Sequence, residues 1–298
     1  MTEIEALYYK KDYECDIRII VETVRVEGHG VILLTGPSSC GKGEIAKALC
    51  KFLSIPKERH LSMGEILRGT VIKAKEDIWF KNKLSEEYGI CYNNSILDMD
   101  RNKVETIKKV ENYIGELEEF FNKTINDVSQ LDWLEFCVNK GLLIPDEWTE
   151  QIMDAAMRNS IELREGIFIL DGYPRTIVAA KKLLETFNKA EIPIIKVLHL
   201  SITKHEMINR ALNRKRDDDT TASLERRYNF YVDKVQPSID YLKEKLGVSR
   251  VALIDAHQPV FNVDRTLNVD ASINNVVLSA IQSLGLPSYL LDLDMEKL

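Results

Sequence analysis

A glycine-rich turn between an apolar run and a periodic segment constrains this chain most strongly. Residues 30–34 form a continuous apolar run that leads into GPSSCGKG at residues 36–43. Residues 44–53 then follow a helical periodicity. A buried strand, a glycine-rich turn and a helix in this order form a cradle whose backbone N–H groups bind phosphate. The sequence therefore predicts nucleotide binding, against the alternative of a glycine-rich turn that only packs.

The glycine-rich turn belongs to a longer alternation of apolar runs and helical stretches. Further continuous apolar runs occupy residues 166–170, 196–200 and 250–254, and helical stretches separate them. Buried runs that alternate with helices are typical of a parallel sheet covered on both faces. The sequence therefore predicts an α/β protein whose central parallel sheet lies between two helical layers.

One long segment interrupts this alternation. Residues 70–138 are rich in Lys and Glu, and residues 103–122 carry an apolar stripe with a helical pattern. We interpret residues 70–138 as a helical subdomain inserted into a domain that covers residues 30–284. Residues 1–29 are then an N-terminal extension, and residues 285–298 are a C-terminal tail.

Charge and cysteine content narrow the class of protein. The 298 residues carry a formal net charge of −7, with a pI near 5.5, which argues against general nucleic-acid binding. The five cysteines show no Cys-x-x-Cys spacing, so neither a disulfide framework nor a zinc site is expected. No window approaches about 18 uninterrupted apolar residues, and the charged N-terminus lacks the apolar core of a signal peptide. We therefore expect a cytoplasmic protein that binds neither nucleic acid nor membrane.

Three motifs follow one another along the chain: GPSSCGKG (36–43), HLSMGEILRG (60–69) and ILDGYPRT (169–176). Their order resembles that of the adenylate kinase family of nucleoside monophosphate kinases. The resemblance extends to GLLIPDEWT (141–149), NRALNRKRDDD (209–219), ERRYNFYVDKVQPSIDYL (225–242) and IDAHQPV (254–260). It implies a three-layer α/β/α P-loop kinase fold, ATP as co-substrate, Mg²⁺ as cofactor, and phosphoryl transfer to a nucleoside monophosphate. AMP is the leading acceptor, which gives the reaction ATP + AMP ⇌ 2 ADP.

The resemblance also implies an ATP site built around the glycine-rich turn. Lys42 and the loop amides would hold the donor phosphates, and Asp171 would orient water molecules around Mg²⁺. Arg210 would lie against the donor base. The residues implied for ATP binding are Gly36, Ser38, Ser39, Cys40, Gly41, Lys42, Gly43, Glu44, Arg210, Arg214, Gln258 and Pro259.

An acceptor site is implied within residues 60–145, together with a short lid at residues 210–219. Arg175 would clamp the acceptor phosphate, with Arg68 as its partner. The residues implied for acceptor binding are Met63, Arg68, Leu143, Ile144, Gly172, Arg175, Ala179, Arg216 and Arg227. Those implied for catalysis are Lys42, Asp171, Arg175, Arg214, Arg216 and Arg227, of which the last three would neutralise charge on the transferred group.

Four positions depart from the pattern of adenylate kinases. Glu44 replaces a Thr, and Ser39 replaces a loop Gly. Met63 also stands in place of a Thr, and Ala179 in place of the Gln that grips the adenine edge. An apolar wall discriminates weakly between bases, so the acceptor base stays open. The alternatives are a UMP/CMP-type kinase, another small-molecule kinase of this fold, or a catalytically weak nucleotide-binding regulatory or scaffold protein.

The role of residues 70–138 stays open as well. The segment could lengthen the acceptor lid, admit a larger acceptor, or provide a surface for a protein partner, which we favour. We expect a monomer, because family members with short lids are commonly monomers. Histidines outside the 254–260 segment, His60 and His199 among them, are expected to be structural or surface residues, since this chemistry needs no histidine base.

Overall fold

The computed structural model describes residues 7–9, 18–20, 28–99, 104–159, 165–214 and 220–285. The chain divides into two compact units. The sheet unit comprises Met1–Ser62, Ser160–Lys215 and Leu224–Leu298. The helical unit comprises Met63–Asn159 and Arg216–Ser223. The domain boundaries expected from the sequence stay a prediction.

A five-stranded parallel sheet is the centre of the sheet unit, with strand order β4-β5-β3-β6-β7. The strands are β3 (Gly30–Thr35), β4 (His60–Ser62), β5 (Ile167–Asp171), β6 (Ile194–Ser201) and β7 (Val251–Asp255). Sequence patterning predicts four of these strands. It misses β4, because three half-buried residues carry too short an apolar signal.

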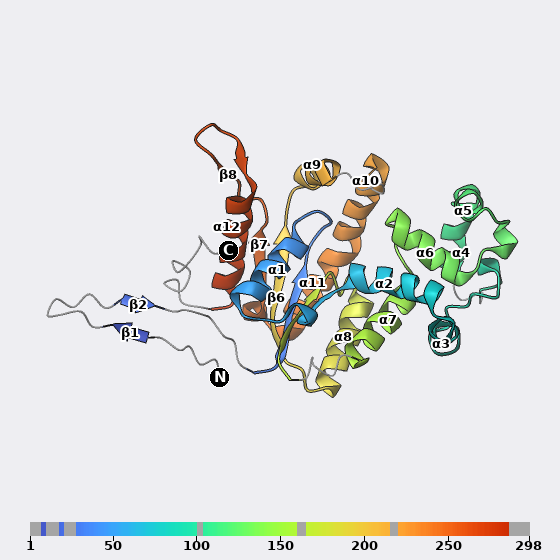
Figure 1. Ribbon diagram of the computed structural model, residues 1–298, viewed down its shortest axis with the longest axis horizontal. Coiled ribbons are helices and arrows are strands. Elements are labelled where there is room, and N and C mark those ends of the chain that lie inside the picture. The colour runs from blue at the N-terminus through green and yellow to red at the C-terminus, as the bar shows by residue number, and fades with distance from the viewer. Residues whose placement is uncertain are drawn as a thin grey trace. The chain divides into compact units, whose positions relative to one another are not determined.

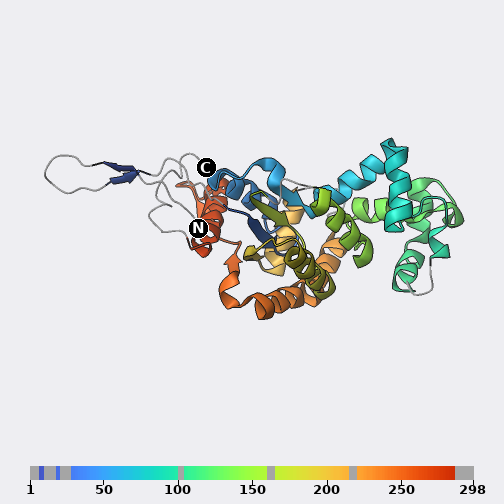
Figure 2. The same ribbon diagram turned by 90° about the horizontal axis from the view of Figure 1, so that it is seen from below.

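Helices cover both faces of this sheet (Figures 1 and 2). Alternate residues of one strand point to opposite faces, and β5 follows this rule. Ile167 and Ile169 join the apolar core formed with α1 (Lys42–Phe52) and α12 (Val269–Ser283). The ring of Phe168 lies 6.0 Å from that of Phe187 in α8 (Ile177–Lys189), and α8 packs against α11 (Gln236–Leu246). The three-layer α/β/α fold predicted from the sequence is confirmed.

Smaller elements complete the sheet unit. Leu224 of α10 (Thr221–Phe230) packs against Met207 and Ala211 of α9 (Lys204–Arg214). A π-helical turn, η6 (Tyr231–Val235), joins α10 to α11. The remaining elements are β1 (Leu7–Tyr9) paired with β2 (Arg18–Ile20), β8 (Val260–Phe261) paired with β9 (Leu267–Asn268), η1 (Lys57–Arg59) and η7 (Val248–Arg250).

The helical unit is built from six α-helices among its described residues. They are α2 (Met63–Glu76), α3 (Ile78–Tyr88), α4 (Val104–Glu111), α5 (Ile114–Phe121), α6 (Gln130–Lys140) and α7 (Asp146–Asn159), with short 3-10 turns η2 (Ile96–Asp98) and η4 (Ile125–Asp127). Helix α2 packs against α3, α6 and α7. Ser129 and Asp132 form a capping box that fixes the start of α6.

The helical pattern predicted for residues 103–122 is confirmed, but two helices divide it. Helix α4 ends at Glu111, and α5 begins at Ile114 after Tyr113, which takes a non-helical conformation with φ −124°. The ring of Tyr113 lies 6.3 Å from Trp133 and 5.9 Å from Phe136, so packing against α6 outweighs helix continuation. Part of the apolar stripe therefore fills the unit's own core. In the part of the chain that is described, no helix is both long and apolar enough to cross a membrane.

Candidate active site

The phosphate loop, residues 36–43, connects β3 to α1 at the carboxyl edge of the sheet. Gly36 has φ 143°, and a Cβ at this position would lie 2.6 Å from the carbonyl oxygen of Leu200. Ser39 and Gly41 are also left-handed, with φ 58° and 91°. Gly41 is the N-cap residue of α1, and no side chain caps the helix there. The first N–H groups of α1 therefore face the loop. Such a nest of amides at a helix N-terminus binds anions.

Lys42 places its ammonium group inside this loop. Its Nζ donates to the carbonyl oxygens of Gly36 at 3.0 Å and Pro37 at 2.7 Å, and it lies 3.7 Å from Sγ of Cys40. The loop backbone thus holds the cation where phosphate oxygens would bind. Because both oxygen partners are neutral carbonyls, an anion can take their place at a gain in Coulomb energy.

Glu44 points away from the loop. Its Oε1 accepts a hydrogen bond from Lys47 Nζ at 3.0 Å, and the two side chains are 58% and 68% exposed. The carboxylate therefore forms a solvated ion pair on the surface of α1. Its substitution for Thr puts no negative charge into the cradle.

Asp171 ends β5, where its carboxylate is buried. Its Oδ2 lies 3.7 Å from Nε2 of His60, and its Oδ1 has no hydrogen-bond partner among the described residues. The charge of Asp171 helps to raise the pKa of the Cys40 thiol, after the larger effect of burial, which indicates that the carboxylate faces the loop. A buried, unpartnered carboxylate oxygen beside a phosphate cradle fits the water shell of a Mg²⁺ ion. Among the described residues, no group of three or more His, Cys, Asp or Glu gathers to hold a metal directly.

Arg175 and Arg227 come together beside Asp171. Arg175 Nε donates to the carbonyl oxygen of Gly172 at 3.0 Å, which fixes the guanidinium near the end of β5. Arg175 is an exposed residue, yet protein atoms surround its guanidinium closely enough to desolvate it. Desolvation and the positive charge of Arg227 lower the pKa of Arg175 to about 10, against the opposing effect of Asp171. Two guanidinium groups held within electrostatic reach of each other favour a bound anion between them.

Arg210 ties α9 to the turn after β7. Its Nε donates to Glu206 at 2.6 Å, and its Nη2 donates to the carbonyl oxygen of Ala256 at 2.9 Å. Although desolvation opposes the shift, hydrogen bonds and charges from Arg210 and His257 hold the pKa of Glu206 below its ordinary value. Gln258 in the same turn donates to the carbonyl oxygen of Asp255 at 2.8 Å and to Ser279 at 3.0 Å. The structure thus brings together Arg210 and the turn that the sequence assigns to the donor base.

Comparison with known proteins agrees with this geometry. A family model described as adenylate kinase matches residues 120–246. An adenylate kinase of Cyanothece sp. is 25% identical over 236 residues, which cover 78% of this chain and 90% of the relative. One of Corynebacterium urealyticum is 24% identical over 232 residues, covering 78% and 93%. A UMP-CMP kinase of Lentinula edodes is 30% identical over 143 residues, covering 42% and 61%.

The chain is thus similar to adenylate kinases along more than three quarters of its length. These similarities indicate a phosphotransferase of the nucleoside monophosphate kinase class. Within this family framework, the sheet unit carries the phosphate loop, Asp171, Arg175, Arg227 and Arg210. These positions come from four separate parts of the chain. The loop follows β3 and Asp171 ends β5, two neighbouring parallel strands, whereas Arg210 and Arg227 lie on α9 and α10.

The remaining predicted site residues are divided between the units. In the sheet unit, Ala179 is buried in the first turn of α8, and its N–H donates to the capping Thr176. In the helical unit, Met63 is buried, and the guanidinium of Arg68 folds back over Gly64. The others lie as follows: Leu143 and Ile144 are half-buried before α7, Gly172 donates to Leu34, Arg214 is exposed at the end of α9, and Pro259 is exposed. Arg216 lies outside the described residues.

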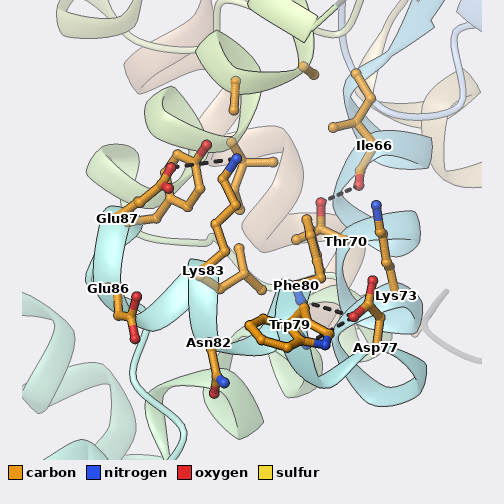
Figure 3. A pocket seen from close by; sticks show the side chains of 15 residues that line it. Ile66, Thr70, Lys73, Asp77, Trp79, Phe80, Asn82, Lys83, Glu86 and Glu87 are labelled. Atoms are coloured by element: carbon orange, nitrogen blue, oxygen red, sulfur yellow. Dashed lines mark hydrogen bonds and ion pairs between the residues drawn. The ribbon is translucent and has the colours of Figure 1, made fainter.

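The helical unit contains a hollow of about 650 Å³ between α2, α3 and α7 (Figure 3). Asp77 caps α3 by accepting from the N–H groups of Trp79 and Phe80, and Lys83 pairs with Glu87 on its wall. Trp79 is 82% exposed. None of the residues that line this hollow is among those predicted for the nucleotide site. The candidate active site is therefore defined by the phosphate loop and its neighbours, and not by this hollow.

Two histidines prove to be more closely involved than the sequence indicated. His60 faces Asp171, and His199 hydrogen-bonds Thr35, the last residue before the phosphate loop, at 2.9 Å. Both occupy strands, β4 and β6, where a lone histidine in the sequence does not reveal its neighbours on other strands. The register of neighbouring strands, which places Thr35 opposite His199, was the missing information.

Proposed function

We propose that the chain transfers the γ-phosphoryl group of ATP to a nucleoside monophosphate, with AMP as the leading acceptor. The observation that carries this proposal is the approach of Lys42, Asp171, Arg175 and Arg227 at one edge of the sheet. Phosphoryl transfer asks mainly for positioning and charge neutralisation, and these residues supply both.

In the proposed reaction, the loop amides and Lys42 bind the donor phosphates. An oxygen of the acceptor phosphate attacks the γ-phosphorus, and the bond to the bridging oxygen of ADP breaks. Arg175 holds the acceptor phosphate, and Arg227 stabilises the charge that spreads over the transferred group. Arg68, Arg214 and Arg216 are proposed to add to this set.

The residues present fit a magnesium ion held through water. Asp171 would accept hydrogen bonds from the ion's water ligands through its unpartnered Oδ1. When bound, Mg²⁺ neutralises charge on the donor phosphates and orients them. This role needs no hydroxyl in the loop, so Gly43 and the outward-facing Glu44 are compatible with it.

AMP is the leading acceptor because the relatives that this chain matches over most of their length are named adenylate kinases. The UMP-CMP kinase relative keeps a pyrimidine acceptor as the second candidate. Met63 and Ala179 are proposed to line the acceptor base as an apolar wall, which would discriminate bases weakly. We also propose that the enzyme acts as a cytoplasmic monomer. A protein partner for residues 70–138 stays a prediction.

The test is a panel of acceptors with Mg-ATP: AMP, CMP, UMP, GMP and the deoxy forms. We expect ADP formation that depends on the monophosphate and is fastest with AMP. ATP binding without turnover on any member would support the regulatory alternative. If no monophosphate of the panel raised the rate of ADP formation, but another small acceptor did, the result would support the small-molecule kinase.

A further inference from the structure

A buried chain of polar side chains runs beneath the phosphate loop. Thr35 Oγ1 and His199 Nδ1 lie 2.9 Å apart, and His199 Nε2 lies 2.9 Å from the hydroxyl of Tyr231. The rings of His199 and Tyr231 are stacked, with centroids 5.7 Å apart and planes inclined by 6°. Gln236 Nε2 donates to the same hydroxyl at 3.4 Å. All four residues belong to the sheet unit.

The roles of the two ring nitrogens depend on the tautomer of His199. Because Gln236 donates to Tyr231, the hydroxyl proton of Tyr231 is free to point at His199 Nε2. The neutral tautomer that accepts this proton carries its own proton on Nδ1 and donates it to Thr35. Burial lowers the pKa of His199 to about 4, assisted by the charge of Lys42 and opposed by Asp240, which keeps the ring neutral at physiological pH.

Thr35 and Tyr231, which flank His199 in this hydrogen-bonded row, lead to the two halves of the proposed reaction site. Thr35 is the last residue of β3, and the phosphate loop begins at Gly36. Tyr231 opens the π-helical turn η6, one helical turn after Arg227 in α10. Turns of π-helix inside α-helices are frequent at functional sites. His199 stands between them on β6, directly opposite Thr35 in strand register, and is only 4% exposed.

We propose that His199 is a positioning residue that holds the phosphate loop and the Arg227 helix in one fixed arrangement through its two hydrogen bonds. A misplacement of about 1 Å between a catalytic group and its substrate can lower a rate by about 10²-fold. The inference rests on the proposed function for its kinetic test. It assigns His199 no contact with substrate.

The test compares three single substitutions: His199→Phe removes both hydrogen bonds of His199, Tyr231→Phe removes the one at Nε2, and Thr35→Val removes the one at Nδ1. We expect kcat to fall by about 10- to 100-fold in His199→Phe and by a smaller factor in the other two, with less than about threefold change in the KM for ATP. The double substitution His199→Phe/Tyr231→Phe should cost little more than His199→Phe alone, because one chain is broken in both.

Phe168→Leu is the matched control. Phe168 is fully buried on β5, where it packs against Phe187. Its phenyl ring has no polar atom that could join the hydrogen bonds of Thr35, His199 and Tyr231. It should lower the melting temperature while kcat stays at the wild-type value. If His199→Phe and Tyr231→Phe lower the melting temperature and leave kcat unchanged, His199 only packs and the inference is overturned.

A second measurement keeps the test independent of turnover and of the folding of His199→Phe. In ¹⁵N NMR of the full chain, His199 should show the neutral tautomer protonated on Nδ1, and Tyr231→Phe should shift the amide signals of Gly36, Gly41 and Gly43. Unchanged loop amides in Tyr231→Phe would overturn the inference. Wild-type protein that shows these signals but transfers no phosphoryl group would instead refute the proposed function.

Discussion

The phosphate-loop edge of the sheet and the inserted helical unit differ in what determines their structure. At the sheet edge, backbone geometry places the phosphate loop, Asp171 and Arg175, which lie at the ends of parallel strands or in the turns that follow them. In the helical unit, side-chain packing determines where the helices end and how they contact one another, as the aromatic contacts of Tyr113, Trp133 and Phe136 show. A site built from strand ends is therefore readable from motifs, whereas a helix bundle depends on contacts that the sequence pattern leaves undefined.

The largest effect should follow the loss of Lys42. Lys42→Ala removes the cation that the loop holds over Gly36 and Pro37, so turnover should fall by at least about 10⁴-fold. Lys47→Ala is the matched control on the same helix, where the ammonium pairs with exposed Glu44, and it should keep the wild-type rate. Equal losses in both variants would place the donor phosphates elsewhere. The measurement is steady-state ADP formation.

Arg227 should rank next. Arg227→Ala removes the guanidinium that approaches Arg175, and kcat should fall by about 10³-fold with a smaller change in KM. Arg226→Ala is the control, because Arg226 is the exposed neighbour on the same helix. Initial rates over a range of ATP and monophosphate concentrations separate kcat from KM. A similar small effect of both substitutions would make Arg227 a surface residue.

The helical unit can be weakened without disturbing the loop. Phe136 is fully buried and stacks with Trp133 at 5.9 Å, so Phe136→Ala should cost about 3–5 kcal/mol of that unit's stability. All three tryptophans lie in the helical unit, at positions 79, 133 and 148, so their fluorescence reports its unfolding in urea. The fluorescence midpoint should fall while ATP affinity is unchanged. A parallel loss of ATP affinity would show that the two regions fold as one.

Acid should act on the sheet unit through His199. Its pKa in the folded protein is about 4, below the ordinary value of about 6.5, so the unfolded chain binds the proton first as pH falls. Stability that is complete above about pH 6.5 should then decline by about 3 kcal/mol on acidification to about pH 4. Lys42, Asp240 and Tyr231 are the titratable groups that act on the ring.

Urea titrations at several pH values, followed by circular dichroism, measure this decline. Carboxylates titrate in part of the same range, so the informative quantity is the difference between wild type and His199→Phe. The variant should show a flatter dependence between pH 6.5 and 4. Identical pH slopes would mean that His199 is not held neutral by burial.

The smallest effect should come from Glu44. Because its carboxylate pairs with Lys47 in solvent, Glu44→Gln should change ATP affinity by less than about twofold. Glu44→Thr, which restores the family's residue, should be similar. Titration calorimetry with ATP measures both. An affinity gain of more than tenfold in either variant would show that the carboxylate repels the phosphates.

The sequence predicts the sheet unit well because its signals are local. The run at residues 30–34, the turn at 36–43 and the DGYPR turn after β5 each define their own backbone. The link from Thr35 through His199 to Tyr231 could not be predicted. It depends on the strand register that pairs Thr35 with His199 and on a contact with Tyr231, which lies 32 residues further along the sequence. The break at residues 112–113 was missed because the apolar period continues through it while the backbone does not.

The central claim is that the loop, Asp171, Arg175 and Arg227 form one site for phosphoryl transfer. The most direct measurement is a rapid-quench single turnover with ATP labelled in its γ-phosphate, Mg²⁺ and AMP. The account predicts that the label leaves ATP and appears in the diphosphate formed from AMP, with no inorganic phosphate. Label that stays in ATP, or is released as inorganic phosphate at the same rate with and without AMP, would contradict it.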